Sequence, residues 1–223
     1  MQSKNLWWVG LYAVAMAYLE AAVVFYLRRL YGISDLILSV PPFDPQIGAI
    51  ELGRELATLV MLLTVGWVAG KKIQSRLGFA FFAFGLWDIF YYGWLKVFIG
   101  WPQTFLDPDL LFLVPLPWWG PVLAPMLIAA MMCVGGVLAV IGDDYGRVLR
   151  LSLSNWVTLI VALLLMLYVF MADALRLFPA DFKTLSQLRP TNFYWPIFLF
   201  GLALSGFVFW RILFRRGEKG LFQ

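Results

Sequence analysis

Residues 154–175, SNWVTLIVALLLMLYVFMADAL, form the stretch that decides the fold. They include a single charged residue, Asp173, close to the end of the stretch. The hydrocarbon core of a bilayer is about 30 Å thick, and a helix needs about 20 apolar residues to cross it. This stretch therefore predicts a transmembrane helix.

Five further stretches of similar length and apolar character lie on either side, at 6–29, 47–70, 77–100, 119–141 and 193–214. The composition agrees, because 62% of the residues are hydrophobic and only 13% are charged. A soluble domain carries about 25% charged residues. The sequence thus predicts an all-α integral membrane protein with six transmembrane helices, in a single polytopic domain over residues 1–223.

Basic residues outside the expected helices are distributed unequally between the two sides of the membrane. One side has ten: Lys4, Lys71, Lys72, Arg76, Arg147, Arg150, Arg211, Arg215, Arg216 and Lys219. The other side has five: Arg28, Arg29, Arg176, Lys183 and Arg189. Because the side richer in Lys and Arg faces the cytoplasm, we expect both termini inside, in the cytoplasmic (inner) membrane of a bacterium.

The connection between the third and fourth helices is rich in proline and tryptophan. Residues 101–125 read WPQTFLDPDLLFLVPLPWWGPVLAP. The apolar run at 110–114 is too short to span a bilayer. Trp118 and Trp119 are typical of the headgroup level of a membrane. We therefore expect an interfacial or re-entrant segment here.

The chain has no histidine and only one cysteine, Cys133. These counts exclude haem with His ligands, a His-bearing zinc site and an intramolecular disulfide, and no cofactor bound through His or Cys is expected. Asp107 and Asp109 are typical of a turn with a helix cap. A hard divalent cation held by carboxylates, a lipid and a quinone all stay open. The net charge of +4 is small and spread along the chain, so no nucleic-acid partner is expected.

Ionisable side chains inside the expected spans are the candidate functional residues, because each is costly in lipid unless it is paired or hydrated. In the first helix, Glu20 adjoins a face made by Ala13, Ala17 and Ala21. Small residues of this kind mark places where helices approach each other closely. We therefore expect Glu20 to point into the bundle.

The second and third helices supply the other candidates. The second begins with AIELGRELATL, in which Glu51 and Glu55 are four residues apart and flank Arg54. The third contains GLWDIFYYGWLK, where helical spacing places a polar stripe on one face, formed by Asp88, Tyr92 and Lys96.

These side chains are expected to lie at comparable depths. At about 1.5 Å per residue, Glu20 and Asp88 are roughly 15–20 Å from the inner surface and Glu55 roughly 22 Å. We therefore expect a buried carboxylate–arginine cluster in the outer half of the bundle. Secondary members near the outer helix ends are Arg28, Asp173 and Arg176. The alternative is that such pairs are structural staples between helices.

Three functions fit these features. The first is a non-catalytic membrane subunit of a larger, energy-transducing complex, with membrane lipids and other membrane subunits as partners. The second is a proton- or cation-coupled transporter that uses Glu20, Glu55 and Asp88. The third is a membrane-embedded enzyme acting on a lipid or isoprenoid. The sequence contains no GxSxG, Walker or HExxH motif, so it favours a function without catalysis.

Overall fold

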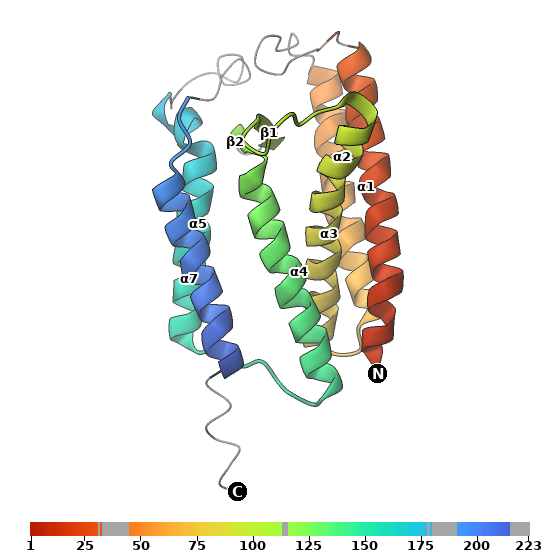
Figure 1. Ribbon diagram of the computed structural model, residues 1–223, viewed down its shortest axis with the longest axis vertical. Helices are drawn as coiled ribbons and strands as arrows, with labels where there is room; N and C mark the ends of the chain where they lie inside the picture. The colour runs from red at the N-terminus through yellow and green to blue at the C-terminus, as the bar shows by residue number, and fades with distance from the viewer. Residues whose placement is uncertain (31, 33–44, 113–115, 178, 180–190, 215–223) are drawn as a thin grey trace, which may run out of the picture.

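The computed structural model of the protein describes residues 1–30, 32, 45–112, 116–177, 179 and 191–214. Within them the chain is mostly helical, with a short 3-10 helix η1 (Gln2–Lys4) and six α-helices (Figure 1). These are α1 (Asn5–Leu30), α2 (Pro45–Ala69), α3 (Ile73–Ile99), α4 (Leu123–Asp144), α5 (Leu153–Arg176) and α7 (Trp195–Phe214). Each predicted span coincides with one of these helices to within four residues.

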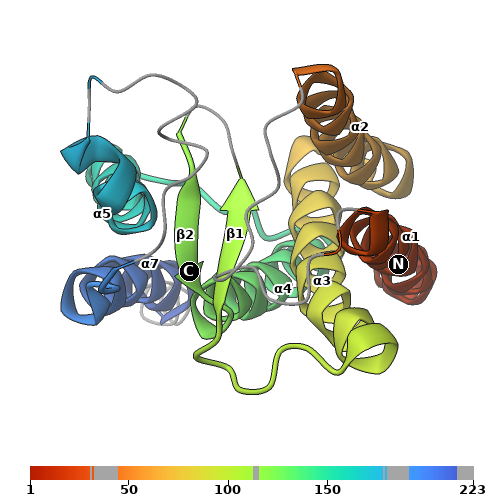
Figure 2. The same cartoon turned by 90° about the horizontal axis from the view of Figure 1, so that it is seen from above.

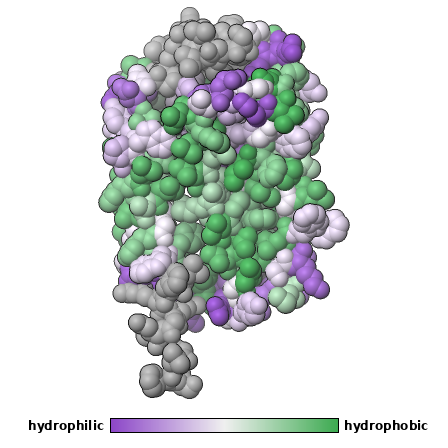
Figure 3. Space-filling view, viewed as in Figure 1, coloured by the Kyte–Doolittle hydropathy of each residue, from purple (hydrophilic) through white to green (hydrophobic). Residues whose placement is uncertain are grey.

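Five of the helices, α1, α2, α4, α5 and α7, are long and apolar enough to cross a membrane. Apolar side chains form a band across the middle of the molecule, and hydrophilic residues gather towards its two ends (Figure 3). The architecture is therefore consistent with an integral membrane protein. The remaining helix, α3, is equally long but is rich in Trp and Tyr and carries Asp88 and Lys96.

The helices form two groups joined near α4. In the first group α3 packs against α1, α2 and α4, with its most extensive contact on α4. In the second group α5 packs against α7, which also contacts α4. Seen from above, the two groups lie on opposite sides of a small hairpin (Figure 2). Basic residues of the topology argument at 183, 189, 215, 216 and 219 lie outside the described residues.

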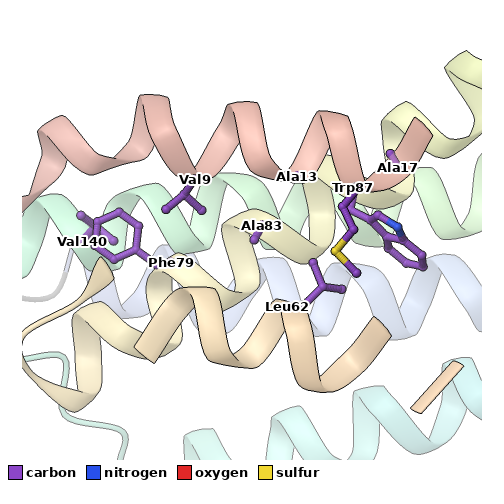
Figure 4. Packing of buried hydrophobic residues seen from close by; sticks show 9 residues of the cluster. Val9, Ala13, Ala17, Leu62, Phe79, Ala83, Trp87 and Val140 are labelled. Carbon is purple, nitrogen blue, oxygen red and sulfur yellow. The ribbon is translucent and has the colours of Figure 1, made fainter. Parts of the chain in front are cut away.

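The core of the first group lies where α1, α2, α3 and α4 meet (Figure 4). Ala13, Ala17 and Ala21 are completely buried, as the sequence predicts. Their small side chains let α1 approach α3 closely. Larger side chains fill the remaining space, among them Val9, Leu62, Phe79, Trp87 and Val140.

A second apolar cluster joins α5 and α7 to the start of α4. Phe170 of α5 and Phe198 of α7 are its largest buried residues, with ring centroids 5.8 Å apart. Trp118 from the connection before α4 stacks on Phe170 at 6.4 Å. The aromatic contact with Trp118 therefore ties the hairpin to the second helix group.

The connection between α3 and α4 folds as an antiparallel hairpin of β1 (Pro108–Phe112) and β2 (Trp118–Pro121). The sequence does not predict these strands, and α4 begins four residues later than the expected span. Prolines explain both differences, since they disfavour helix and are tolerated at strand ends. Pro108 and Pro121 face each other at the end of the hairpin. Residues 113–115 of the apolar run lie outside the described residues.

A hydrogen-bond network holds the chain start against two other elements. The Gln2 backbone N–H donates to Asp144 Oδ1 at 2.6 Å, and its side-chain amide donates to Asp143 Oδ2 at 3.0 Å. Lys72, in the turn between α2 and α3, pairs with Asp143 at 3.1 Å. The start of α1, the α2–α3 turn and the end of α4 thus lie together at one end of the bundle (Figure 1).

Candidate functional site

Two of the predicted carboxylates and the predicted arginine meet between α1 and α2. Arg54 forms ion pairs with Glu20 and Glu51, and its Nε donates to Glu51 Oε1 at 2.9 Å. Thr58, one turn further along α2, donates to Glu20 Oε2 at 3.2 Å. The Glu20 side chain is 12% exposed and that of Arg54 is 22% exposed. We call Glu20, Glu51, Arg54 and Thr58 the α1–α2 cluster.

Glu55 adjoins this cluster without entering it. Its charge interacts with those of Arg54 and Glu51. Within the described part of the chain, however, Glu55 makes no ion pair. The α1–α2 cluster therefore already balances one arginine against two carboxylates, with Glu55 as a third acidic group at its edge.

Asp88 of α3 differs from the other carboxylates. Gly85, one turn earlier, packs against Cys133 of α4, which places the Gly85 face of α3 at the α3–α4 contact. The charge of Asp88 interacts with Cys133 and with Asp109 of β1. No described residue forms an ion pair or hydrogen bond with the Asp88 carboxylate.

Asp109 is a buried acidic residue, although its sequence context is typical of a turn with a helix cap. It is 4% exposed and accepts a hydrogen bond of 3.1 Å from the Tyr92 hydroxyl. Burial raises the pKa of Asp109 above its usual value, although the Arg28 guanidinium, the Tyr92 hydroxyl and the Leu110 N–H each act to lower it. The hairpin therefore brings a second carboxylate within electrostatic range of Asp88.

Arg28 reaches the same region from the end of α1. It is 9% exposed, and its guanidinium lies 4.5 Å above the Trp101 ring. Tyr91 of α3 interacts electrostatically with Arg28, Asp88 and Asp109, and also with Arg54. We call Arg28, Asp88, Tyr91, Tyr92 and Asp109 the outer polar site. Through Tyr91 it lies within electrostatic range of the α1–α2 cluster.

Three predicted residues lie apart from these groups. Lys96 donates to the carbonyl oxygens of Gly100 and Pro102, at 3.1 and 2.7 Å, and so satisfies backbone acceptors where α3 ends. Asp173 accepts two hydrogen bonds from Thr191, at 2.8 and 2.6 Å. Arg176 pairs with Asp173 at 3.7 Å and contacts the Tyr194 hydroxyl. Asp173 and Arg176 therefore tie α5 to the segment before α7.

No protein-family model, curated protein or solved structure matches this chain significantly. Only the chemistry of the α1–α2 cluster and the outer polar site therefore indicates a function. Among the described residues, no group of three His, Cys, Asp or Glu side chains could hold a metal ion. Two interacting carboxylates beside phenol hydroxyls can, however, bind and release a proton or hold one small cation.

Proposed function

We propose that the chain crosses the membrane six times, with both termini on the cytoplasmic side of a bacterial inner membrane. α2 ends and α4 begins at opposite ends of the bundle, and α3 connects them (Figure 1). If α2 and α4 both span, α3 must cross as well. Its Trp and Tyr side chains are tolerated because α1, α2 and α4 surround it. The start of α1 and the end of α7 share one end of the bundle, which supports placing both termini together.

We propose further that the outer polar site binds a proton or a small monovalent cation, as in a coupled transporter. One observation carries this proposal: Asp88 has no ion-pair or hydrogen-bond partner among the described residues and lies within electrostatic range of Asp109. Two carboxylates that interact electrostatically do not both stay ionised at low cost in a membrane. A bound proton or cation removes that cost.

The α1–α2 cluster supports the same site indirectly. Because Arg54 already pairs with Glu20 and Glu51, its charge is committed and does not neutralise Asp88. Arg28 makes no ion pair among the described residues, but its charge interacts with that of Asp109. Asp88 is thus the carboxylate of the outer polar site left for a ligand. A divalent cation has less support, since it prefers six or more oxygen ligands.

Infrared difference spectroscopy on the purified protein tests this proposal directly. Spectra recorded between acidic and neutral pH, and with and without Na⁺ or K⁺, report the C=O stretch of a protonated carboxylic acid. We expect Asp88→Asn to remove a band that responds to pH or to a cation. Asp173→Asn, the matched change outside the site, is expected to keep that band. If the Asp88→Asn spectrum matches wild type under all these conditions, Asp88 binds neither ligand.

A second candidate function, a non-catalytic subunit of a larger membrane complex, has its own support in α2. Only 17% of the most apolar window of α2 is buried. Three small residues, Ala49, Gly53 and Ala57, recur every fourth position on its exposed surface. A Cβ added to Gly53 would meet no atom within 4 Å. Stripes of small residues let a further transmembrane helix pack closely.

Gentle detergent extraction followed by native-gel sizing tests the subunit candidate. Stoichiometric partners that are lost in Gly53→Leu would support docking through α2. Val68→Leu is a suitable control, because Val68 is exposed near the other end of α2. If the wild-type protein migrates without any partner, the subunit candidate is excluded. For a lipid or isoprenoid enzyme, no arrangement of the described residues supplies comparable support.

A further inference from the structure

An apolar groove opens on the surface where α3, α4 and the segment after α3 meet. Its volume is about 450 Å³, within the range of small-molecule sites, which is about 300–1,000 Å³. Its apolar lining includes Ile89 and Phe90 of α3, Phe105 and Met126, and Tyr92 of the outer polar site also lines it. Phe105 is 59% exposed. In a membrane protein such a surface meets the hydrocarbon of the bilayer.

The floor of the groove contains a glycine that leaves space open. Gly93 lines the groove, and a Cβ added there would meet no atom within 4 Å. Gly78 and Gly85 on the same helix are different, because a Cβ on either would collide with α4. Glycine is therefore not needed at position 93 for packing between the described helices. Because it has no side chain, the groove is deeper at this position.

Polar groups lie at one end of the groove, near the end of α3. They are Lys96, Gln103 and Thr104. Lys96 gives two of its three N–H groups to carbonyl oxygens, and it forms no ion pair among the described residues. The nearby Asp107 accepts hydrogen bonds from the Gln103 N–H and the Thr104 hydroxyl, at 2.6 and 2.7 Å. The charge of Asp107 also interacts with that of Lys96, and the third N–H of Lys96 is left for an anionic group at the rim.

We propose that this groove holds one acyl chain of an anionic phospholipid, with the phosphate of the headgroup at Lys96. The lipid comes from the leaflet at the hairpin end of the bundle. Its chain covers Phe90, Phe105 and Met126, which are otherwise in contact with disordered bilayer hydrocarbon. A basic residue near a membrane surface attracts anionic headgroups, and a single one gives about a fivefold preference over zwitterionic lipid. The proposal does not depend on the ligand of the outer polar site.

Native mass spectrometry of the full chain, released from nanodiscs that contain equal amounts of phosphatidylglycerol and phosphatidylcholine, tests this site. We expect one retained phosphatidylglycerol per wild-type chain. Gly93→Leu fills the groove and is expected to abolish that retention. Gly206→Leu is the matched control, since a Cβ at this exposed glycine of α7 also meets no atom within 4 Å. It is expected to retain lipid like the wild type.

Lys96→Gln tests the headgroup contact separately from the apolar groove. We expect this variant to retain one lipid but to lose the preference of about fivefold for phosphatidylglycerol. Thermal unfolding in the same detergent verifies that each variant is folded. Retention by Gly93→Leu equal to the wild type, or an unchanged headgroup preference in Lys96→Gln, would overturn the proposal. Equal retention of both lipids by the wild type would also overturn it.

Discussion

Gly85 of α3 packs directly against Cys133 of α4, so closely that a Cβ added to the glycine would lie 2.8 Å from the Cys133 sulfur. Two turns earlier, a Cβ on Gly78 would lie 2.9 Å from the Gly136 carbonyl oxygen. These glycines are seven residues apart and therefore share one face of α3. They allow the most extensive helix contact in the described structure, between α3 and α4.

Gly85→Ala is expected to destabilise the protein by about 1–3 kcal/mol, because the added methyl group forces α3 and α4 apart. Gly93→Ala on the same helix provides the control. A Cβ there meets no atom within 4 Å, and alanine stabilises a helix relative to glycine by about 0.5–1 kcal/mol. Denaturant titration in detergent micelles measures both changes. If the two substitutions change the free energy of unfolding equally, there is room for a methyl group at position 85 between α3 and α4.

The ion pairs of Arg54 lead to a second prediction. Arg54→Gln leaves the carboxylates of Glu20 and Glu51 in a partly buried position without a cation. Breaking a buried pair by removing one partner costs about 3 kcal/mol or more. We expect denaturant titration in detergent micelles to show that Arg54→Gln lowers the free energy of unfolding by about this amount.

A triple variant separates the ion pairs from other effects of losing Arg54. Replacing Glu20, Glu51 and Arg54 together by glutamine removes all three charges. The effects of substitutions at contacting residues on stability are not additive. We therefore expect the triple variant to be more stable than Arg54→Gln alone. If it is less stable, the cost of losing Arg54 arises from packing and not from unpaired charge.

The sequence predicts the helices because they depend on local composition, and it predicts the polar cluster only in part. Glu20, Glu51 and Arg54 come together, whereas Glu55 and Asp88 make no ion pair with them among the described residues. A transmembrane helix requires only length and apolar composition, which are visible in each stretch. Glu20 is also placed correctly, since Ala13, Ala17 and Ala21 are fully buried on the adjoining face. Arg54, which lies between Glu51 and Glu55 in the sequence, pairs with Glu20 across the α1–α2 contact.

The outer polar site depends on contacts between distant residues and was predicted only in part. Asp109 looks like a capping residue in sequence, and it becomes a site residue only because β1 lies beside Tyr92. A hairpin register cannot be derived from the WPQTFLDPDLLFLVPLPWWGPVLAP stretch, whose prolines hide the strand alternation. Lys96 follows the polar stripe of α3 but turns to the carbonyls of the next segment.

Asp107 and Asp109 are expected to affect stability oppositely as the pH falls. Burial raises the pKa of Asp109 in the folded chain, so the folded state binds its proton more tightly than the unfolded state, where the pKa is about 3.9. Stability contributed by this group therefore increases as the pH falls through the raised pKa. Burial also acts to raise the pKa of Asp107, but hydrogen bonds from Thr104 and Gln103 outweigh it and lower that pKa. Its contribution is lost as the pH falls below about 3.9.

Thermal unfolding of Asp109→Asn and Asp107→Asn across acidic pH measures these contributions as differences from the wild type. The stabilising effect of Asp109→Asn should shrink as the pH falls, because the wild-type carboxyl becomes neutral as well. The destabilising effect of Asp107→Asn should shrink at lower pH, once the wild-type carboxylate has lost its charge. Parallel curves for either variant and the wild type would mean that the titration of that aspartate is not coupled to folding.

Asp88→Asn separates a structural from a functional role for the outer polar site. A carboxylate without a partner is costly to bury, and an amide of the same shape costs less. We therefore expect Asp88→Asn to raise the free energy of unfolding by about 1 kcal/mol, within the range of about 0.5–2 kcal/mol that single stabilising substitutions commonly give. Asp173→Asn should lower it, because Asp173 accepts two hydrogen bonds from Thr191 and pairs with Arg176. A loss of stability in Asp88→Asn as large as that in Asp173→Asn would mean that Asp88 holds the fold together. A gain would indicate that the chain retains an unfavourable charge at this position, as a binding site requires.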